Sequence, residues 1–188
     1  VDLAMAPLIS FLDADDWLHP MYLEEMFSFW KSKGSGIVYS DYYEVRDDEP
    51  VKKRVLPDYD CERAQKQPQH PVYSWCGVNM ILPLECHNAI GGFDEEMDSW
   101  EDWLYIINLS REGYCFHRYD KPLWFYDYHS GYRREHGSDN WDSLIKEVSQ
   151  KTRSKKMGCN DCNQTSNTAQ VISNTTGSIP EDDAKMII

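Results

Sequence analysis

Three carboxylates follow a short apolar run near the start of the chain. The stretch SFLDADDWLHP places Asp13, Asp15 and Asp16 directly behind residues 8–12, LISFL, which are typical of a buried strand. Neighbouring carboxylates repel one another and burial raises their pKa values, so a cation, a helix N-terminus or water must compensate them. On extended backbone Asp13 and Asp15 point the same way and can serve one ion or one diphosphate. Mg²⁺ or Mn²⁺ with phosphate is the favoured interpretation, the alternative being that Asp15 or Asp16 caps a following helix.

A second acidic cluster is GGFDEEMDSWEDW, residues 91–103. Six of the nine residues from 94 to 102 are acidic. A carboxylate here can take a proton from an attacking hydroxyl group, with its pKa tuned by Trp100 and Trp103. Ser99 and Asp102 also have nearly the spacing of a capping box, in which acidic side chains stabilise a first helical turn without any chemistry. The residues alone leave both interpretations open.

The third cluster is YDYHSGYRREH, residues 126–136, with His129, His136, Arg133 and Arg134. Imidazole can ligate Mn²⁺, and arginine can bind a diphosphate through two parallel hydrogen bonds. A histidine among aromatic residues is more often structural, and paired arginines are more often a solvated face. Basic groups are otherwise scarce up to this point of the chain, so the functional interpretation also stays open.

Strands alternating with helices must position these clusters. We expect strands over 8–12, 36–45, 78–84 and 114–129, the last broken near 120–122, and helices over 20–33, 85–90 and 100–113. Residues 46–70 are polar and contain three prolines, which predicts a long loop. This order is typical of an α/β sheet, in which ligands bind at the carboxyl ends of the strands.

The composition limits the classes of function. The chain has 188 residues and a net charge of -13, which makes a nucleic-acid interface improbable, and its 41% hydrophobic content suits one domain with a tail. No stretch approaches the ~18 apolar residues of a membrane span, and no leader is apparent, so we expect a cytoplasmic protein. The six cysteines match no disulfide framework, and the pair Cys159 and Cys162 lacks the further ligands that zinc needs. Nothing in the sequence indicates an oligomeric state.

Three stretches occur in the order, and at about the spacing, of a known family: SFLDADDWLHPMYLEEM, VNMILPLECHNAIGGFDEEMDSWEDW and KPLWFYDYH. Over residues 1–137 the sequence resembles the family 2 nucleotide-sugar glycosyltransferases of the GT-A fold. The resemblance implies an α/β fold of partial GT-A type, Rossmann-like, with a mostly parallel mixed sheet and flanking helices. It divides the chain into the C-terminal two-thirds of a GT-A domain, 1–137, whose opening strand and helix are missing, a basic terminal helix, 138–157, and a disordered tail, 158–188.

The resemblance also implies a reaction, the inverting transfer of a sugar from a nucleoside-diphosphate sugar, with a UDP-sugar favoured, to an acceptor hydroxyl group. Asp13 and Asp15 match the DxD motif that binds Mn²⁺ or Mg²⁺, and Asp102 matches the general base, with Glu101 as the alternative. The other implied site residues are His129 as a metal ligand, Asp16, Arg133, Arg134 and His136 for the diphosphate, and Gly92, Asp94, Trp100 and Trp103 on the acceptor side. The QxxRW-type motif of processive members is not found, which favours single additions.

Two other classes of function compete with this one. Haloacid-dehalogenase-like phosphatases also begin with an apolar strand and DxD, but the residue two places after their second Asp is typically Thr or Val, and here it is Trp17. The chain could instead be a non-catalytic remnant or a sugar- or nucleotide-binding module, in which Trp and Tyr side chains stack on sugar rings. An assay of the released product, phosphate or nucleotide, separates the enzymes.

Overall fold

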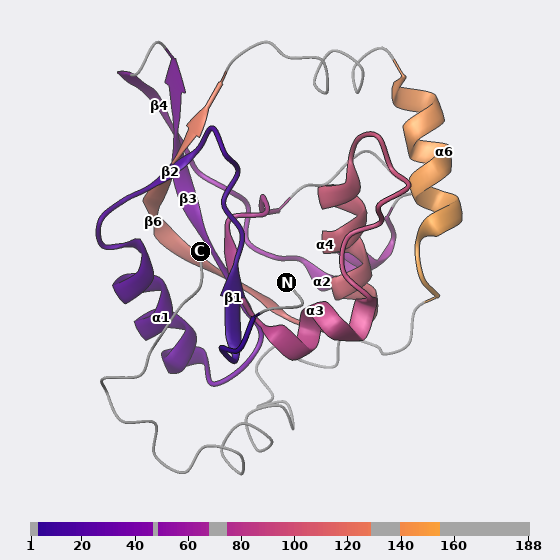
Figure 1. Cartoon of the computed structure of the whole chain (residues 1–188), viewed down its shortest axis with the longest axis horizontal. Helices are drawn as coiled ribbons and strands as arrows, with labels where there is room; N and C mark the ends of the chain where they lie inside the picture. The colour runs from indigo at the N-terminus through magenta and orange to yellow at the C-terminus, as the bar shows by residue number, and fades with distance from the viewer. Residues whose placement is uncertain (1–3, 47–48, 68–74, 129–139, 155–188) are drawn as a thin grey trace.

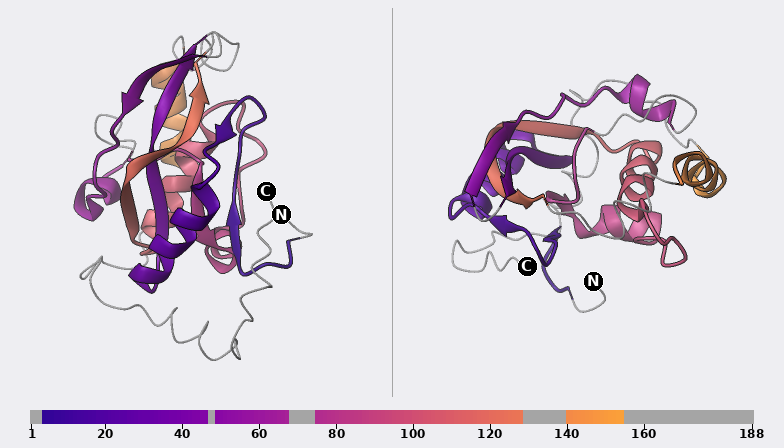
Figure 2. Two further views of the ribbon diagram at one scale, coloured as in Figure 1. Left: turned by 90° about the vertical axis from the view of Figure 1, so that its left-hand side faces the viewer. Right: turned by 90° about the horizontal axis from the view of Figure 1, so that it is seen from above.

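A computed structural model describes residues 4–46, 49–67, 75–128 and 140–154. It shows a mixed sheet with helices on both faces, which confirms the expected α/β class (Figures 1 and 2). The strands are β1 (Leu8–Ser10), β2 (Trp17–Leu18), β3 (Ile37–Arg46), β4 (Glu49–Arg54), β5 (Met80–Pro83) and β6 (Phe116–Asp127). The helices are α1 (Tyr22–Lys33), α2 (Cys61–Gln65), α3 (Leu84–Ile90), α4 (Glu101–Arg111) and α6 (Trp141–Lys151). No helix in the described ranges is long and apolar enough to cross a membrane.

The sheet has the strand order β1-β5-β3-β6-β2, and β4 pairs with β3. Helix α1 connects β1 to β3, and these two strands and β6 run in the same direction. Strand β5 lies between β1 and β3 and runs against both. The expected predominance of parallel pairs is therefore wrong for the described strands, in which β3 and β6 form the parallel pair and the other pairings are antiparallel.

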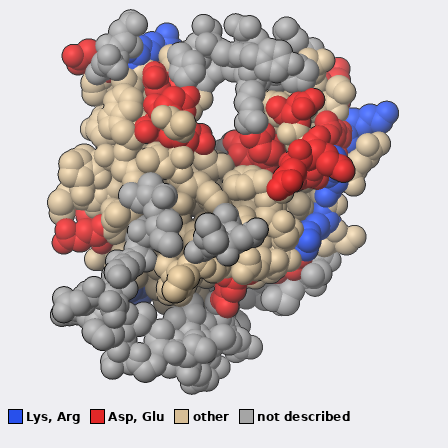
Figure 3. Space-filling view, viewed as in Figure 1, with Lys and Arg blue, Asp and Glu red and all other residues tan. Residues whose placement is uncertain are grey.

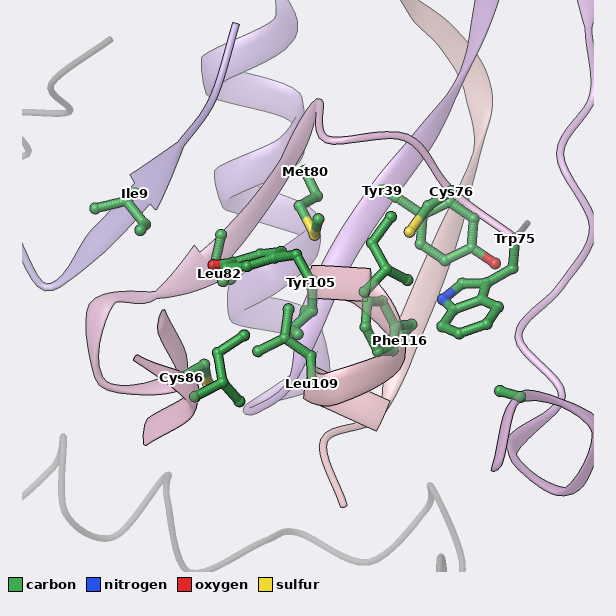
Figure 4. Packing of buried hydrophobic residues seen from close by; sticks show 14 residues of the cluster. Ile9, Tyr39, Trp75, Cys76, Met80, Leu82, Cys86, Tyr105, Leu109 and Phe116 are labelled. Atoms are coloured by element: carbon green, nitrogen blue, oxygen red, sulfur yellow. The ribbon is translucent and has the colours of Figure 1, made fainter. Parts of the chain in front are cut away.

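Alternating apolar residues divide the core between the two faces of the sheet. On one face, Leu8, Val38 and Ile81 pack with Tyr22 and Met26 of α1. The opposite face packs against α3 and α4, with a cluster that includes Ile9, Tyr39, Met80, Leu82, Cys86, Tyr105, Leu109 and Phe116 (Figure 4). Helices α1 and α4 are thus packed on opposite faces of one sheet.

Helix α4 is buried on all sides beyond its first two residues, up to Ser110. The sequence predicts an apolar stripe along one side, but residues 103–110 are all buried. The reason is α6, whose Leu144 and Val148 are buried and which covers the side of α4 that faces away from the sheet. Figure 1 and the right-hand view of Figure 2 show α6 lying beside α4. The start of α4 is therefore held by the sheet and by α6 together.

Two expectations about the connections need correction. The predicted loop over 46–70 contains β4 and α2. Strand β4 tolerates Pro50 because this residue lies at an irregularity of the β3–β4 register, where a missing N–H is allowed. Strand β6 continues through Pro122, where the register with β3 shifts, and is not broken there. The two-residue strand β2 has no periodicity to predict it. The predicted basic helix over 138–157 contains α6, and the predicted disordered tail lies outside the described residues.

The buried ion pair between Asp41 and Arg118 secures β3 to β6 at this shift. Asp41 is fully buried, and its two carboxylate oxygens accept bonds from Nε (2.9 Å) and a terminal nitrogen (3.2 Å) of Arg118. We expect Arg118→Ala to lower the free energy of unfolding by about 3 kcal/mol, because it leaves a buried carboxylate with Lys53, 3.8 Å away, as its nearest cation. Urea unfolding measures the change, with the exposed Lys52→Ala as control; equal stabilities of the two variants would exclude this role.

Candidate active site

A cavity of about 1030 Å³ lies where β1 and β6 end and α4 begins. In the space-filling view, acidic side chains gather on both sides of a hollow in the upper half of the molecule (Figure 3). Among the described residues that line the cavity none is Lys, Arg or His, whereas seven are acidic: Asp13, Asp15, Asp94, Glu95, Glu101, Asp102 and Asp127. The apolar and aromatic lining residues include Phe11, Leu12, Val78, Phe93, Met97, Trp100 and Tyr126.

The loop after β1 forms one wall, and Asp16 holds it in place. The backbone N–H of Asp16 donates to the carbonyl of Asp13 (3.1 Å), which turns the loop so that Asp13 and Asp15 line the cavity while Asp16 is buried. The Asp16 carboxylate accepts bonds from the backbone N–H of Asp127 (3.0 Å) and from the side-chain amide of Asn79 (3.1 Å). Asp16 therefore connects this loop to the end of β6 and to the residue before β5.

The alternative role of these carboxylates as helix caps does not apply to α1. Its N-cap residue is Met21, which makes no side-chain cap bond. The side chain of Asp16 is directed to Asn79 and Asp127 instead.

Burial raises the pKa of Asp16 to about 7; the bond from the Asp127 N–H opposes this, and the charges of Asp13 and Asp15 add to it. The side-chain oxygen of Asn79 is buried without a hydrogen-bond partner. A neutral group of the same shape can therefore replace the Asp16 carboxylate, because the Asn79 amide can turn its oxygen toward a donor.

We expect Asp16→Asn to leave the free energy of unfolding at pH 7 within about 1 kcal/mol of the parent and Asp16→Ala to lower it by about 1–3 kcal/mol. The alanine variant removes both bonds and leaves the N–H of Asp127 and the amide of Asn79 without this partner. Urea unfolding of the two variants side by side measures the difference. An asparagine variant as unstable as the alanine variant would show that the charge of Asp16, and not its hydrogen bonds, stabilises the loop.

The start of α4 forms the opposite wall. Glu101 and Asp102 line the cavity, and Asp102 accepts the backbone N–H of Trp103 (2.7 Å). The N-cap residue of α4 is Trp100 and not Ser99, and the Trp100 side chain makes no cap bond. Among the described non-glycine residues, Trp100 alone has a positive φ, 63°, which is strained for a bulky side chain.

Asp102 is exposed to the water of the cavity, but much of its wider surroundings is protein. This desolvation raises the pKa of Asp102, while the N–H of Trp103 opposes the rise and the charges of Glu101 and Asp13 increase it. A carboxylate with a raised pKa is a better proton acceptor near neutral pH than an ordinary aspartate.

The other expected acceptor-side residues are divided between the cavity and its surroundings. Asp94 and Trp100 line the cavity. Trp103 is buried in the cluster between α4 and α6. Gly92 lines a separate cavity of about 240 Å³ and has a φ of 81°, and a Cβ there would lie 3.1 Å from Nε2 of His87. The expected ligands His129, Arg133, Arg134 and His136 lie outside the described residues.

Sequence reasoning missed Asn79 and Asp127, the two partners of Asp16. Asp127 stands in the stretch YDYH that the family resemblance covers, so its position before His129 could have drawn attention to it. Asn79 lies 63 residues from Asp16 and has no spacing that points to it.

The carboxylates on the wall formed by the loop after β1 suit a hard divalent cation. Asp13 and Asp15 offer carboxylate oxygens, which Mg²⁺ and Mn²⁺ prefer, and the surrounding carboxylates create negative charge that a cation offsets. In the described ranges no three His, Cys, Asp or Glu side chains are grouped so as to hold an ion by themselves. Mg²⁺ commonly uses one or two protein carboxylates and takes its other ligands from phosphates and water, and Asp13 and Asp15 fit that pattern.

Comparisons with known proteins agree with this fold. Staphylococcus aureus TarS 1-349 in complex with UDP-GlcNAc is 15% identical, with a TM-score of 0.59, over 84% of this chain and 46% of that one. The same fragment in complex with UDP is 15% identical, with a TM-score of 0.58, over 84% and 44%. A third TarS structure is 12% identical, with a TM-score of 0.58, over 84% and 27%. The chain thus spans less than half the length of these proteins, with which it shares a GT-A-like fold.

No protein of curated function matches the chain. Residues 1–89 match the family described as Glycosyl transferase family 2. The match includes the strand β1, the loop with Asp13, Asp15 and Asp16, and Asn79, which the structure brings together at one end of the sheet. Over residues 1–89 the chain is therefore similar to glycosyl transferase family 2 domains.

Proposed function

We propose that the chain is the catalytic part of a non-processive, inverting glycosyltransferase that moves a sugar from a nucleoside-diphosphate sugar to an acceptor hydroxyl group with the help of Mn²⁺ or Mg²⁺. The observation that carries the proposal is one cavity that is lined by Asp13 and Asp15 on one wall and by Asp102 on the other. The fold shared with TarS, which was solved in complex with UDP-GlcNAc, supports a UDP-sugar as the donor.

The wall after β1 is the donor side of the proposed site. Asp13 and Asp15 would hold the cation, while Asp16 keeps their loop against β5 and β6. When bound, the cation supplies positive charge that stabilises the diphosphate as it leaves. An acidic cavity repels a bare diphosphate, so we expect the donor to bind together with its cation.

The wall at the start of α4 is the acceptor side. Asp102 takes the proton of the acceptor hydroxyl group as its oxygen attacks the anomeric carbon, and the bond to the diphosphate breaks on the opposite face of the sugar. Inversion requires base and leaving group on opposite sides of the anomeric carbon, which agrees with carboxylates on two facing walls. The Trp100 ring offers an apolar surface beside Asp102 on which a sugar ring can stack. Glu101 is the alternative base.

The experiment is an assay of released nucleotide with UDP-GlcNAc, Mn²⁺ and a panel of methyl glycosides as acceptors. The proposal predicts UDP release that depends on Mn²⁺. It also predicts that proton NMR of the product shows a β linkage at the anomeric carbon of the transferred sugar, which is α-linked in the donor. A product with retained configuration would exclude the inverting mechanism. Binding of UDP without any release would favour the binding module, and phosphate released from a phosphomonoester would favour the phosphatase.

A further inference from the structure

Helix α6 contacts the acceptor wall although it lies beyond residues 1–89, the part of the chain that matches the family. Its buried residues Leu144 and Val148 hold it in place, and Val148 packs with Trp103 and Leu104 of α4. From this position α6 reaches the segment of residues 93–100, here called the wall segment, at both of its ends.

At one end of the wall segment, Lys151 binds two carboxylates. Its Nζ lies 3.0 Å from each carboxylate oxygen of Asp94 and 3.2 Å from Oε2 of Glu96. Asp94 also accepts the backbone N–H of Glu96 (3.0 Å), so the ammonium group closes a local turn. Lys151 lowers the pKa of Asp94, which keeps this carboxylate ionised among the acidic residues of the segment. The ammonium group of Lys151 thereby offsets the repulsion between the carboxylates of Asp94 and Glu96, which would otherwise push the wall segment apart.

At the other end, Trp141 packs against the strained residue. The rings of Trp141 and Trp100 meet edge to face with their centroids 4.8 Å apart, and Trp100 meets Trp103 in the same way at 5.3 Å. A φ of 63° is strained for a bulky residue and persists only where packing holds the residue in place. The rings of Trp103 and Trp141 hold Trp100 in this way. Glu101 and Asp102 follow Trp100 directly, so the conformation of Trp100 sets the direction in which α4 begins.

We propose that α6 is a positioning element of the acceptor wall, in which Lys151 and Trp141 hold the wall segment in the conformation that directs Asp102 into the cavity opposite Asp13 and Asp15. The catalytic consequence rests on the proposed function, whereas the two contacts and their effect on the wall segment do not. Lys151 and Trp141 do not line the cavity of the proposed active site and act through Asp94 and Trp100.

The test compares the full chain with Lys151→Ala and Trp141→Ala, and follows amide hydrogen exchange of the wall segment by mass spectrometry. Exchange in residues 93–100 should become about fivefold faster in each variant, while the core strand β3 keeps its protection. Lys151→Arg should restore the parental rate because it keeps the cation. Lys146→Ala, an exposed lysine of the same helix, is the matched control and should leave exchange unchanged. Unchanged exchange in both Lys151→Ala and Trp141→Ala would overturn the proposal.

The catalytic readout is UDP release from UDP-GlcNAc in the presence of Mn²⁺. The two variants should lower kcat about tenfold and leave the KM for UDP-GlcNAc within about twofold, because the donor wall is built without α6. Equal losses in kcat and in donor affinity would contradict a positioning role and indicate that α6 merely stabilises the chain. If the parent releases no UDP, the proposed function fails, and faster exchange of the wall segment still supports the positioning of that segment by α6.

Discussion

Asp102→Asn lowers the turnover of sugar transfer by about 100-fold or more and changes Mn²⁺-dependent binding of UDP by less than about twofold. The amide has the shape of the carboxylate and can still accept the N–H of Trp103, so α4 begins as before. It cannot take a proton from the acceptor. Binding of UDP is preserved because Asp13 and Asp15 lie on the opposite wall. Initial rates of UDP release and calorimetric titration of UDP measure the two quantities.

Two matched variants make this result specific. Asp98→Asn changes an exposed carboxylate that is near in sequence and does not line the cavity, and it should keep parental turnover. Glu101→Gln changes the neighbouring carboxylate and should keep most of the turnover if Asp102 is the base. Parental turnover in Asp102→Asn together with a large loss in Glu101→Gln would move the base to Glu101. Parental turnover in both variants would remove the general base from this wall.

The pH dependence of kcat/KM gives an independent check on Asp102. The base must be ionised, so kcat/KM falls as the pH drops through the pKa of Asp102, and desolvation sets this pKa above that of an ordinary aspartate. The acid limb should therefore have its midpoint above the usual aspartate range. Glu101→Gln should lower the midpoint, because the charge of Glu101 contributes to the raised pKa. A midpoint that stays in place would show that another group controls the limb.

The second large effect is expected at the donor wall. The double substitution Asp13→Ala/Asp15→Ala should weaken binding of UDP in the presence of Mn²⁺ by more than about 100-fold, since it removes both carboxylates that offer oxygens to the cation on this wall. Without Mn²⁺ the variant should bind UDP no more weakly than the parent, because two negative charges have left an acidic cavity. Calorimetric titrations with and without Mn²⁺ measure both affinities.

The control for this experiment is Glu24→Ala/Asp120→Ala, which removes the same charge from exposed positions that do not line the cavity. It should bind UDP and Mn²⁺ as the parent does. An equal loss in both double variants would attribute the effect to the total charge of the chain. Strong UDP binding by Asp13→Ala/Asp15→Ala in the presence of Mn²⁺ would show that the diphosphate lies elsewhere.

Local patterns in the sequence predict the elements that carry the proposed catalytic residues. The apolar run before Asp13 corresponds to β1, and the helix predicted over 100–113 contains α4, which carries Glu101 and Asp102. These elements have clear periodicity and clear stop signals, and most of their structure is decided within about ten residues. The cavity at the carboxyl ends of β1 and β6 follows from the general rule for α/β sheets.

Long-range contacts decide the features that the sequence does not show. The direction of β5 depends on its insertion between β1 and β3. Pro50, one of the prolines that suggest a loop, is accommodated at an irregular strand pair. The partners of Asp16 come from two distant segments, Asn79 and Asp127. A capping box is the local explanation for the acidic start of α4, but Trp100 takes the N-cap position because two other tryptophan rings pack on it.

The most direct measurement is the position of manganese in crystals of the chain grown with UDP and Mn²⁺, determined from anomalous scattering. The account predicts a single manganese peak beside the carboxylates of Asp13 and Asp15, with the diphosphate in the cavity between them and Asp102. A well-defined diphosphate at another surface, or a manganese ion bound away from Asp13 and Asp15, would contradict the assignment of this cavity as the donor site.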